Sequence, residues 1–192
     1  MAHVLHPHPS APAPALRVLA SVATEAADGF ALRYRVEGEV ARLRIPARQP
    51  RTARDGLWAH TCFELFVGDA GTARYREFNF SPSGEWAAYD FRGYRERDTA
   101  QELAADVEPP RIATTSGAAW LEVEAFVPAR RLPPVTNPAL RIGLTAVIET
   151  NDGSLSYWAL HHPGARPDFH DRDAFVLAPG NGTFHPSAAR KS

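Results

Sequence analysis

A chain of 192 residues is long enough for one domain with a sizeable core, since domains typically span roughly 100 to 200 residues. Its 21 basic and 22 acidic residues give a formal net charge of -1, which argues against nucleic acid or an anionic membrane as a partner. No apolar run reaches the ~18 residues of a membrane-spanning helix, and the N-terminus lacks the pattern of an export signal. We therefore expect a cytoplasmic protein, and its single cysteine, Cys62, agrees with a reducing compartment.

The two ends of the chain have compositions that favour disorder. Residues 1–15 are rich in proline and contain few large apolar side chains, so they bury too little surface to offset the entropy lost on ordering. The same argument applies to residues 181–192. We expect one folded domain over residues 16–180 between two disordered tails.

Alternation of apolar and polar residues with a period of two dominates the middle of the chain and predicts about ten short strands. A Glu37-Gly38 turn between the first two predicts a solvated hairpin. Residues 96–107 have apolar spacing near that of a helix but run into Glu-Pro-Pro, so a short helix and a wrapped loop both stay open. Many short strands separated by turns are typical of a β-sandwich or barrel. The predicted strands cover residues 30–36, 40–45, 60–67, 74–80, 86–91, 111–115, 120–127, 140–149, 154–160 and 173–178.

The sequence Ser81-Pro82-Ser83-Gly84 has the composition of a tight turn. Proline sets φ at the second position, the first serine can hydrogen-bond back to the chain, and glycine closes the turn. Residues 78–91 are therefore predicted to form a hairpin around Pro82-Ser83.

Polar side chains occupy one face of several predicted strands. Glu64 shares one face of its predicted strand with Cys62 and Phe66. On the next strand, Asn79 shares a face with Glu77 and Tyr75. If these faces lie together, one sheet presents a concave polar surface on which Arg141 pairs with Glu64 or Glu149, because buried charges need partners. Alternation does not reveal whether this face is roofed or exposed, so a solvated face with surface ion pairs is the other interpretation.

Aromatic side chains add a second ingredient of a ligand site. Indole and phenol rings stack on the C–H face of a sugar while amides and carboxylates bind its hydroxyl groups. Core packing is the alternative for each tryptophan. The candidate ligand-binding residues are Glu64, Asn79, Trp86, Tyr89, Arg141, Glu149 and Trp158, drawn from a wider aromatic set that also includes Trp58, Trp120 and Tyr157.

The segment 156–175 concentrates histidine and aspartate between prolines and glycines. His161, His162 and His170 are candidate ligands for a divalent metal or a haem. Their spacing matches none of the common zinc patterns, and a loop tied by aspartate hydrogen bonds around a buried Phe169 is the alternative. The chain contains no G-x-S-x-G, P-loop, G-x-G-x-x-G or C-x-x-C motif, so we do not expect an enzyme.

Four ordered motifs over residues 16–178 resemble bacterial DOMON-like proteins, which are relatives of the type-nine carbohydrate-binding modules. The resemblance implies an all-β fold, a two-sheet antiparallel β-sandwich, in a non-catalytic module whose relatives bind sugars or haem. Haem held by a Met–His pair is excluded because Met1 is the only methionine, whereas a bis-histidine site stays open. The motifs are Glu64 with Phe66, Tyr75 with Phe78, Trp120 with Glu124 and Pro128, and Phe169 to Asp171.

Three functions follow as hypotheses. The first is a non-catalytic domain that binds a small, saccharide-like ligand on a concave sheet face. The second is a haem or metal protein that uses His161, His162 or His170. The third is a protein-interaction domain without a small ligand, and the oligomeric state is left open.

Overall fold

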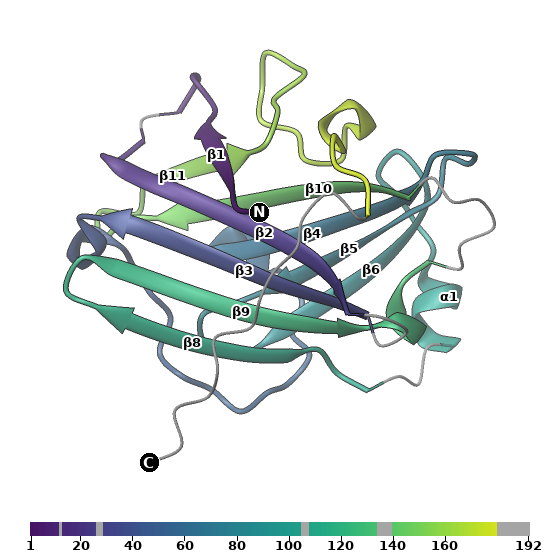
Figure 1. The fold of residues 1–192 in the computed structure, drawn as a ribbon, viewed down its shortest axis with the longest axis horizontal. Coiled ribbons are helices and arrows are strands. Elements are labelled where there is room, and N and C mark those ends of the chain that lie inside the picture. Colours follow the sequence, from purple (N-terminus) through teal and green to yellow (C-terminus); the bar gives the residue numbers. More distant parts are fainter. Residues whose placement is uncertain (12, 26–28, 105–107, 134–139, 180–192) are drawn as a thin grey trace.

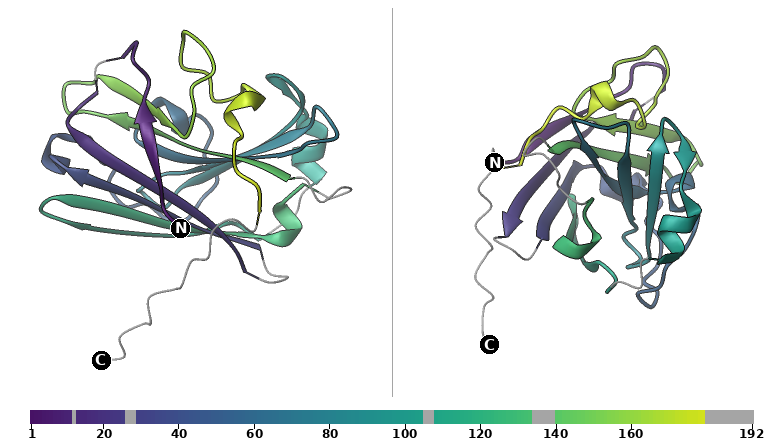
Figure 2. Two further views of the ribbon diagram at one scale, coloured as in Figure 1. Left: turned by 45° about the horizontal axis from the view of Figure 1, so that its top comes forward. Right: turned by 90° about the vertical axis from the view of Figure 1, so that its right-hand side faces the viewer.

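The structure is a computed structural model that describes the chain except for residues 12, 26–28, 105–107, 134–139 and 180–192. The C-terminal tail expected over residues 181–192 lies outside the described residues. The strands form two layers, which separate clearly in the right-hand view of Figure 2. All pairs of neighbouring strands are antiparallel, so the expected two-sheet antiparallel β-sandwich is confirmed.

The front sheet, which faces the viewer in Figure 1, has the order β1-β2-β3-β9-β8. The rear sheet has the order β7-β6-β5-β4-β10-β11-β1. The front strands are β1 (His3–Pro7), β2 (Leu16–Glu25), β3 (Gly29–Gly38), β8 (Arg111–Gly117) and β9 (Trp120–Pro128). The rear strands are β4 (Cys62–Asp69), β5 (Tyr75–Phe80), β6 (Trp86–Gly93), β7 (Glu96–Arg97), β10 (Leu140–Glu149) and β11 (Leu155–Ala159).

Strand β1 belongs to both sheets and joins them along one edge. Its first residues pair with β2, and His6 and Pro7 pair with β11. Leu5, in the middle of β1, is buried in the core. The expectation of disorder over residues 1–15 is therefore wrong for this segment, because the edges of two sheets supply hydrogen-bond partners that a reading of local composition cannot see.

The core lies between the sheets and is built by the alternation seen in the sequence. In β3, Phe30, Leu32 and Tyr34 point inward and are buried, while Arg33 and Arg35 face outward. From the rear sheet, Phe63 packs against Tyr34 with ring centroids 5.1 Å apart. The Tyr34 hydroxyl crosses between the layers and donates a 2.6 Å hydrogen bond to the backbone carbonyl of Glu64.

The hairpin over residues 78–91 is confirmed. Gly84 donates its N–H to the Ser81 carbonyl at 3.0 Å and has φ 95, a left-handed value that glycine adopts without a Cβ clash. For residues 96–107, the sequence leaves both a short helix and a wrapped loop open. The structure has a helix, α1 (Thr99–Ala104), in this segment, and residues 105–107 are not described.

Two predicted strands are wrong. Val40 to Arg42 form a 3-10 turn instead of a hairpin partner, since β3 already pairs with β2 and β9. Over residues 173–178 the chain makes a 3-10 turn, Arg172–Ala174, and a single bridge from Leu177 to Ile142. Further 3-10 turns are Leu57–Ala59 and Ala129–Arg131. Within the described residues, no helix is long and apolar enough to cross a membrane.

Candidate functional site

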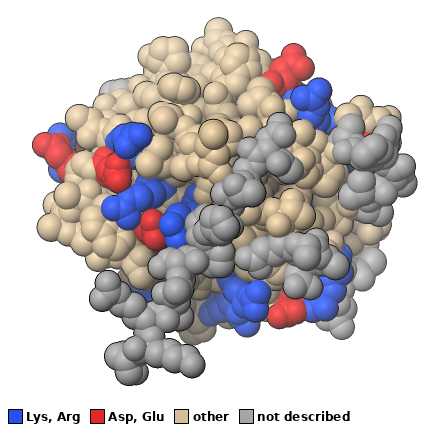
Figure 3. All heavy atoms as spheres, in the orientation of Figure 1, with Lys and Arg blue, Asp and Glu red and all other residues tan. Residues whose placement is uncertain are grey.

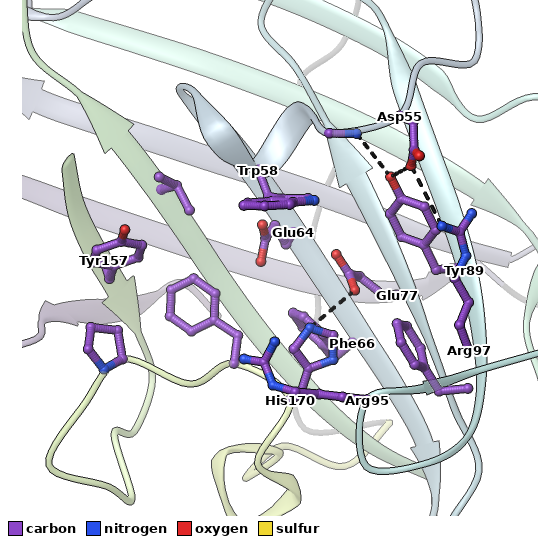
Figure 4. Close-up of a pocket in the computed structure, with 15 residues that line it drawn as sticks. Asp55, Trp58, Glu64, Phe66, Glu77, Tyr89, Arg95, Arg97, Tyr157 and His170 are labelled. Atoms are coloured by element: carbon purple, nitrogen blue, oxygen red, sulfur yellow. Dashed lines mark hydrogen bonds and ion pairs between the residues drawn. The ribbon is translucent and has the colours of Figure 1, made fainter. Parts of the chain in front are cut away.

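A cavity of about 490 Å³ lies on the outer face of the rear sheet, away from the core. This volume is within the range of roughly 300 to 1,000 Å³ that is usual for small-ligand sites. Its floor consists of alternate residues of the central strands, and its walls are loops (Figure 4). The floor residues are Glu64, Phe66, Glu77, Tyr89, Phe91, Val147 and Tyr157, and the wall residues are Asp55, Gly56, Trp58, Arg95, Arg97, Pro167, Phe169 and His170.

Strand pairing brings the two glutamates of the floor together. Glu64 lies opposite Asn79 in the ladder between β4 and β5, and Glu77 lies two residues before Asn79 on the same face. Figure 4 shows both carboxyl groups pointing into the cavity. Glu64 accepts a 2.9 Å hydrogen bond from the Thr145 hydroxyl, and Glu77 accepts one of 2.7 Å from the Asn79 amide.

Both carboxyl groups are held towards their neutral form. Burial raises the pKa of Glu64 well above its usual range, and the nearby charge of Glu77 raises it further. Burial also raises the pKa of Glu77 to about 7, against the opposing effect of the Asn79 hydrogen bond. Each group can therefore donate or accept a hydrogen bond near neutral pH.

The first wall is the segment before β4, which carries Trp58. A 3-10 turn, Leu57–Ala59, follows Gly56, whose φ of 75 lets the chain bend over the sheet. Tyr89 holds this segment in place by donating a 2.5 Å hydrogen bond to Asp55 and accepting one of 3.3 Å from the Gly56 N–H. The Trp58 side chain is left 56% exposed above Glu64 (Figure 4).

The second wall is the loop after β11, anchored by Phe169. Phe169 is buried among aromatic and aliphatic residues of the cavity face, as predicted. The predicted aspartate ties are also present, since Asp168 accepts from the His170 N–H and Asp171 from the Asp173 N–H, each at 3.0 Å. The loop therefore has the architecture expected from its sequence.

His170 lies inside the cavity as a neutral imidazole. Burial, followed by the charge of Arg95, lowers its pKa to about 4. Its Nδ1 lies 2.8 Å from the Tyr75 hydroxyl, and its Nε2 lies 3.7 Å from Glu77 Oε2. If the Tyr75 hydroxyl donates to Nδ1, the proton of the neutral ring is on Nε2 and points towards Glu77.

Two arginines close the remaining side, and each has an acidic partner. Arg95 lies 2.8 Å from Asp168. Arg97 lies 2.8 Å from Glu102 and covers the Tyr89 ring at 4.3 Å from its centroid. These arginines shape the wall while their charges are largely offset by carboxylates.

Of the predicted ligand-binding residues, the structure brings three to the cavity or directly beneath it. Glu64 and Tyr89 line the cavity, and Asn79 lies beneath it as the support of Glu77. Whether these residues bind a ligand stays a prediction.

The other predicted ligand-binding residues lie elsewhere. Trp158 is 2% exposed in the core and donates a 2.9 Å hydrogen bond to Ser156, so it offers no surface to a ligand. Trp86 lies under Arg131, whose Cζ is 4.6 Å from the ring centroid, and lines a different hollow. The reason is the strand period of two, since Trp86 and Tyr89 are three apart and cannot share a face.

The predicted ion pairs of Arg141 are also wrong. Arg141 is exposed near the start of β10, opposite Gly68, whereas Glu64 lies opposite Thr145. Glu149 instead accepts from Arg44 and lies beside His60, both at 2.8 Å. The rear face is therefore roofed at its centre and open at its ends.

The three histidines proposed as metal or haem ligands do not converge. His161 is exposed, His162 contacts the backbone carbonyl of His6 at 2.8 Å, and His170 faces Glu77. Over the described parts of the chain, no group of three His, Cys, Asp or Glu side chains is arranged to hold a metal ion. A common site for all three histidines is therefore excluded among the described residues, whereas metal or haem binding by His161, His162 or His170 stays a prediction.

Several cavity residues escaped the site prediction. Tyr157 belongs to the predicted aromatic set and lines the cavity in place of its neighbour Trp158, a difference that strand parity alone decides. Trp58 was in the same set, but no periodicity places a residue of a turn. Arg95 and Arg97 follow β6 in a segment where the register shifts, and nothing in the sequence marked them.

No protein-family model matches this sequence, and no curated protein matches it. A solved structure from Bacteroides uniformis ATCC 8492, a protein to which carbohydrate binding has been attributed, is 15% identical, with a TM-score of 0.63 over 91% of this chain and 84% of that one. A carbohydrate-binding module of family 9 from Caldicellulosiruptor kristjanssonii, solved with glucose, is 7% identical, with a TM-score of 0.52 over 78% of this chain and 69% of that one. At these identities the likeness concerns the fold alone. The β-sandwich of this chain is similar to that of family 9 carbohydrate-binding modules, and the narrower DOMON resemblance stays a prediction.

Proposed function

We propose that this protein is a non-catalytic saccharide-binding domain whose ligand occupies the cavity on the outer face of the rear sheet. The observation that carries the proposal is that the Trp58 side chain lies above Glu64 and that both line the cavity. An indole left 56% exposed above a buried carboxyl group offers a flat apolar surface on one side and a hydrogen-bonding group on the other. A pyranose ring has this same division between its C–H faces and its hydroxyl edge.

The polar groups of the floor suit hydroxyl ligands. A sugar hydroxyl donates and accepts, and so does a protonated carboxyl group such as that of Glu77 near neutral pH. The Nε2 of His170 adds a further polar atom beside Glu77. The likeness of the fold to sugar-binding proteins supports this choice of ligand class.

Binding without catalysis is favoured by the electrostatics of the floor. Hydrolysis of a glycoside by a carboxyl pair needs one group protonated and the other ionised. Here burial raises the pKa of Glu64 well above its usual range and that of Glu77 to about 7, so the ionised partner is present only in part near neutral pH.

Isothermal titration calorimetry with a panel of monosaccharides and disaccharides tests the proposal. We expect dissociation constants of about 1 μM to 1 mM, equivalent to roughly -8 to -4 kcal/mol. Trp58→Ala should weaken binding about tenfold or more, because it removes the stacking surface. Trp120→Ala is the matched control, since Trp120 stacks with Arg35 on the front sheet, at 4.7 Å from the ring centroid, far from the cavity. An absence of binding across the panel, or equal losses in both variants, contradicts the proposal.

A further inference from the structure

The charges around the cavity are distributed unequally. The basic groups on its walls, Arg95 and Arg97, have carboxylate partners in Asp168 and Glu102. His170 is neutral near pH 7, because its pKa is lowered to about 4. Both arginines are thus held by carboxylates of the walls, while their charges still oppose the rise in the pKa of Glu77.

The acidic groups of the floor lack equivalent partners. Glu64 is 2% exposed, and its Oε2 receives the Thr145 hydroxyl, while its Oε1 has no hydrogen-bond partner among the described residues. Glu77 has the Asn79 amide on Oε1 and only the neutral His170 ring, at 3.7 Å, near Oε2. Glu64 therefore presents to the cavity an oxygen atom that is accessible from it and to which a donor group of a ligand can hydrogen-bond.

We propose that the cavity selects an amino sugar, a pyranose that carries a free ammonium group, over the corresponding neutral sugar. This inference rests on the proposed saccharide-binding function and specifies its ligand. The ammonium group lies between the carboxyl groups of Glu64 and Glu77, and the sugar ring lies against Trp58.

The cost of burying the two acids supports this assignment. With no ligand present, burial raises the pKa of both carboxyl groups, and the charge of Glu77 raises the pKa of Glu64 further. An ammonium group between them permits one to ionise and gains charge-assisted hydrogen bonds, which are roughly twice as strong as neutral ones. A neutral sugar gains only the neutral bonds.

The remaining groups around the floor agree with a cationic ligand. Asp55 adds a third carboxylate to the lining, and the faces of aromatic rings attract cations. Tyr89 already accepts Arg97 on one face of its ring, at 4.3 Å. Repulsion from Arg95 and Arg97 opposes the ammonium group, but Asp168 and Glu102 offset these two charges.

The test is calorimetry at pH 7 with D-glucosamine, D-glucose, N-acetyl-D-glucosamine and choline. We expect glucosamine to bind about tenfold more tightly than glucose, since an ammonium replaces a neutral donor. N-acetylglucosamine, which has no charge at this position, should bind more weakly than glucosamine. Glu77→Gln should reduce the preference for glucosamine over glucose severalfold, and Glu64→Gln is the second variant should the first fail to fold. Glu124→Gln, on the outer face of the front sheet, is the matched control and should keep the preference.

Each result decides the inference. Equal or tighter binding of glucose overturns the amino-sugar assignment and leaves the saccharide-binding function standing. Choline that binds as tightly as glucosamine shows recognition of the cation alone and overturns it too. If none of the sugars binds, the proposed function fails together with the inference. A preference for glucosamine that survives in both glutamine variants places the recognition elsewhere and contradicts the mechanism.

Discussion

The outer faces of the two sheets have similar alternating sequences but different environments. On the front sheet, Arg33 and Arg35 alternate with buried residues of β3 and pair with Glu124 and Glu122, at 2.7 Å and 3.3 Å. Figure 3 shows basic and acidic atoms interspersed on this face. On the rear sheet, Glu64 and Glu77 alternate with buried residues in the same way, yet loops cover them and no arginine of the described residues forms an ion pair with them.

The difference shows how covering the face of a sheet changes the chemistry of its side chains. A charge on an open face is solvated and paired, so it contributes little to stability or to specificity. A carboxyl group beneath a roof loses its hydration, and its pKa shifts instead. The same residue type is therefore part of a solvated surface on one sheet and a cavity-facing group on the other.

The largest expected effect is on the second wall, the loop after β11 that covers the cavity face. Phe169→Ala removes a buried ring that anchors the second wall, at a cost of about 3 to 4 kcal/mol of unfolding free energy and a fall of roughly 10 °C in Tm. Phe126→Ala is the matched truncation on the front sheet, where Arg111 covers a partly exposed ring at 4.3 Å from its centroid. Thermal unfolding should show a clearly smaller loss for Phe126→Ala. Equal losses would show that the roof is no more tightly packed than the open face.

The next effect concerns the pH dependence of stability. The folded pKa of Glu77, about 7, is above its ordinary value of 4.5, so the folded state binds more protons than the unfolded state between these pH values. Stability therefore falls as the pH rises through this window, by at most about 3 kcal/mol from this group. Glu77→Gln cannot titrate, and its stability relative to the parent protein should rise between pH 4.5 and 7.

Denaturant unfolding at several pH values measures this difference directly. Glu122→Gln on the front sheet is the control for the loss of a carboxylate from an open face. The difference between the variant and the parent isolates the contribution of Glu77 from that of His170. Because the pKa of His170 is lowered to about 4, its contribution makes stability rise with pH between pH 4 and 6.5. A flat difference for Glu77→Gln means that the carboxyl is hydrated and that the face is not roofed.

A smaller effect is expected at His170. His170→Ala removes one hydrogen bond to Tyr75, whose hydroxyl keeps the Arg95 N–H at 3.0 Å, so we expect a loss of about 1 kcal/mol in unfolding free energy. Ligand affinity should fall in the same variant, because Nε2 lies beside Glu77. A destabilisation as large as that of Phe169→Ala would assign the histidine a purely structural role.

The smallest effect is expected on the open face. Glu124→Gln breaks the ion pair with Arg33. The side chain of Glu124 is 47% exposed and that of Arg33 is 29% exposed, so the unfolding free energy should change by less than about 1 kcal/mol. In 1 M salt the unfolding free energies of the variant and the parent should differ even less, since salt screens exposed charges. A larger loss that is insensitive to salt would show that this face is also desolvated.

The sequence predicted the sandwich and its 78–91 hairpin because alternation and turn chemistry are local properties. It missed β1, since residues 3–7 become a strand only where the edges of two sheets meet. It placed Glu64, Asn79 and Tyr89 on the cavity face but chose Trp158 over Tyr157. One step along a strand reverses the face, and composition cannot supply that parity.

The loops account for the remaining errors. Trp58 reaches the cavity because Gly56 bends the chain and Tyr89 holds it, contacts that join residues 33 and 34 positions apart. The same limit applies to His161, His162 and His170, which are close in sequence and point to different surroundings. Long-range contacts of this kind decide whether a polar face is roofed.

The most direct test of the central claim is a crystal structure of the protein grown with glucosamine or glucose at a concentration well above its dissociation constant. The account predicts a sugar ring against Trp58, with its polar edge towards Glu64 and Glu77. A sugar bound on the front sheet or at the open end near Arg141, with the roofed cavity empty, would contradict it.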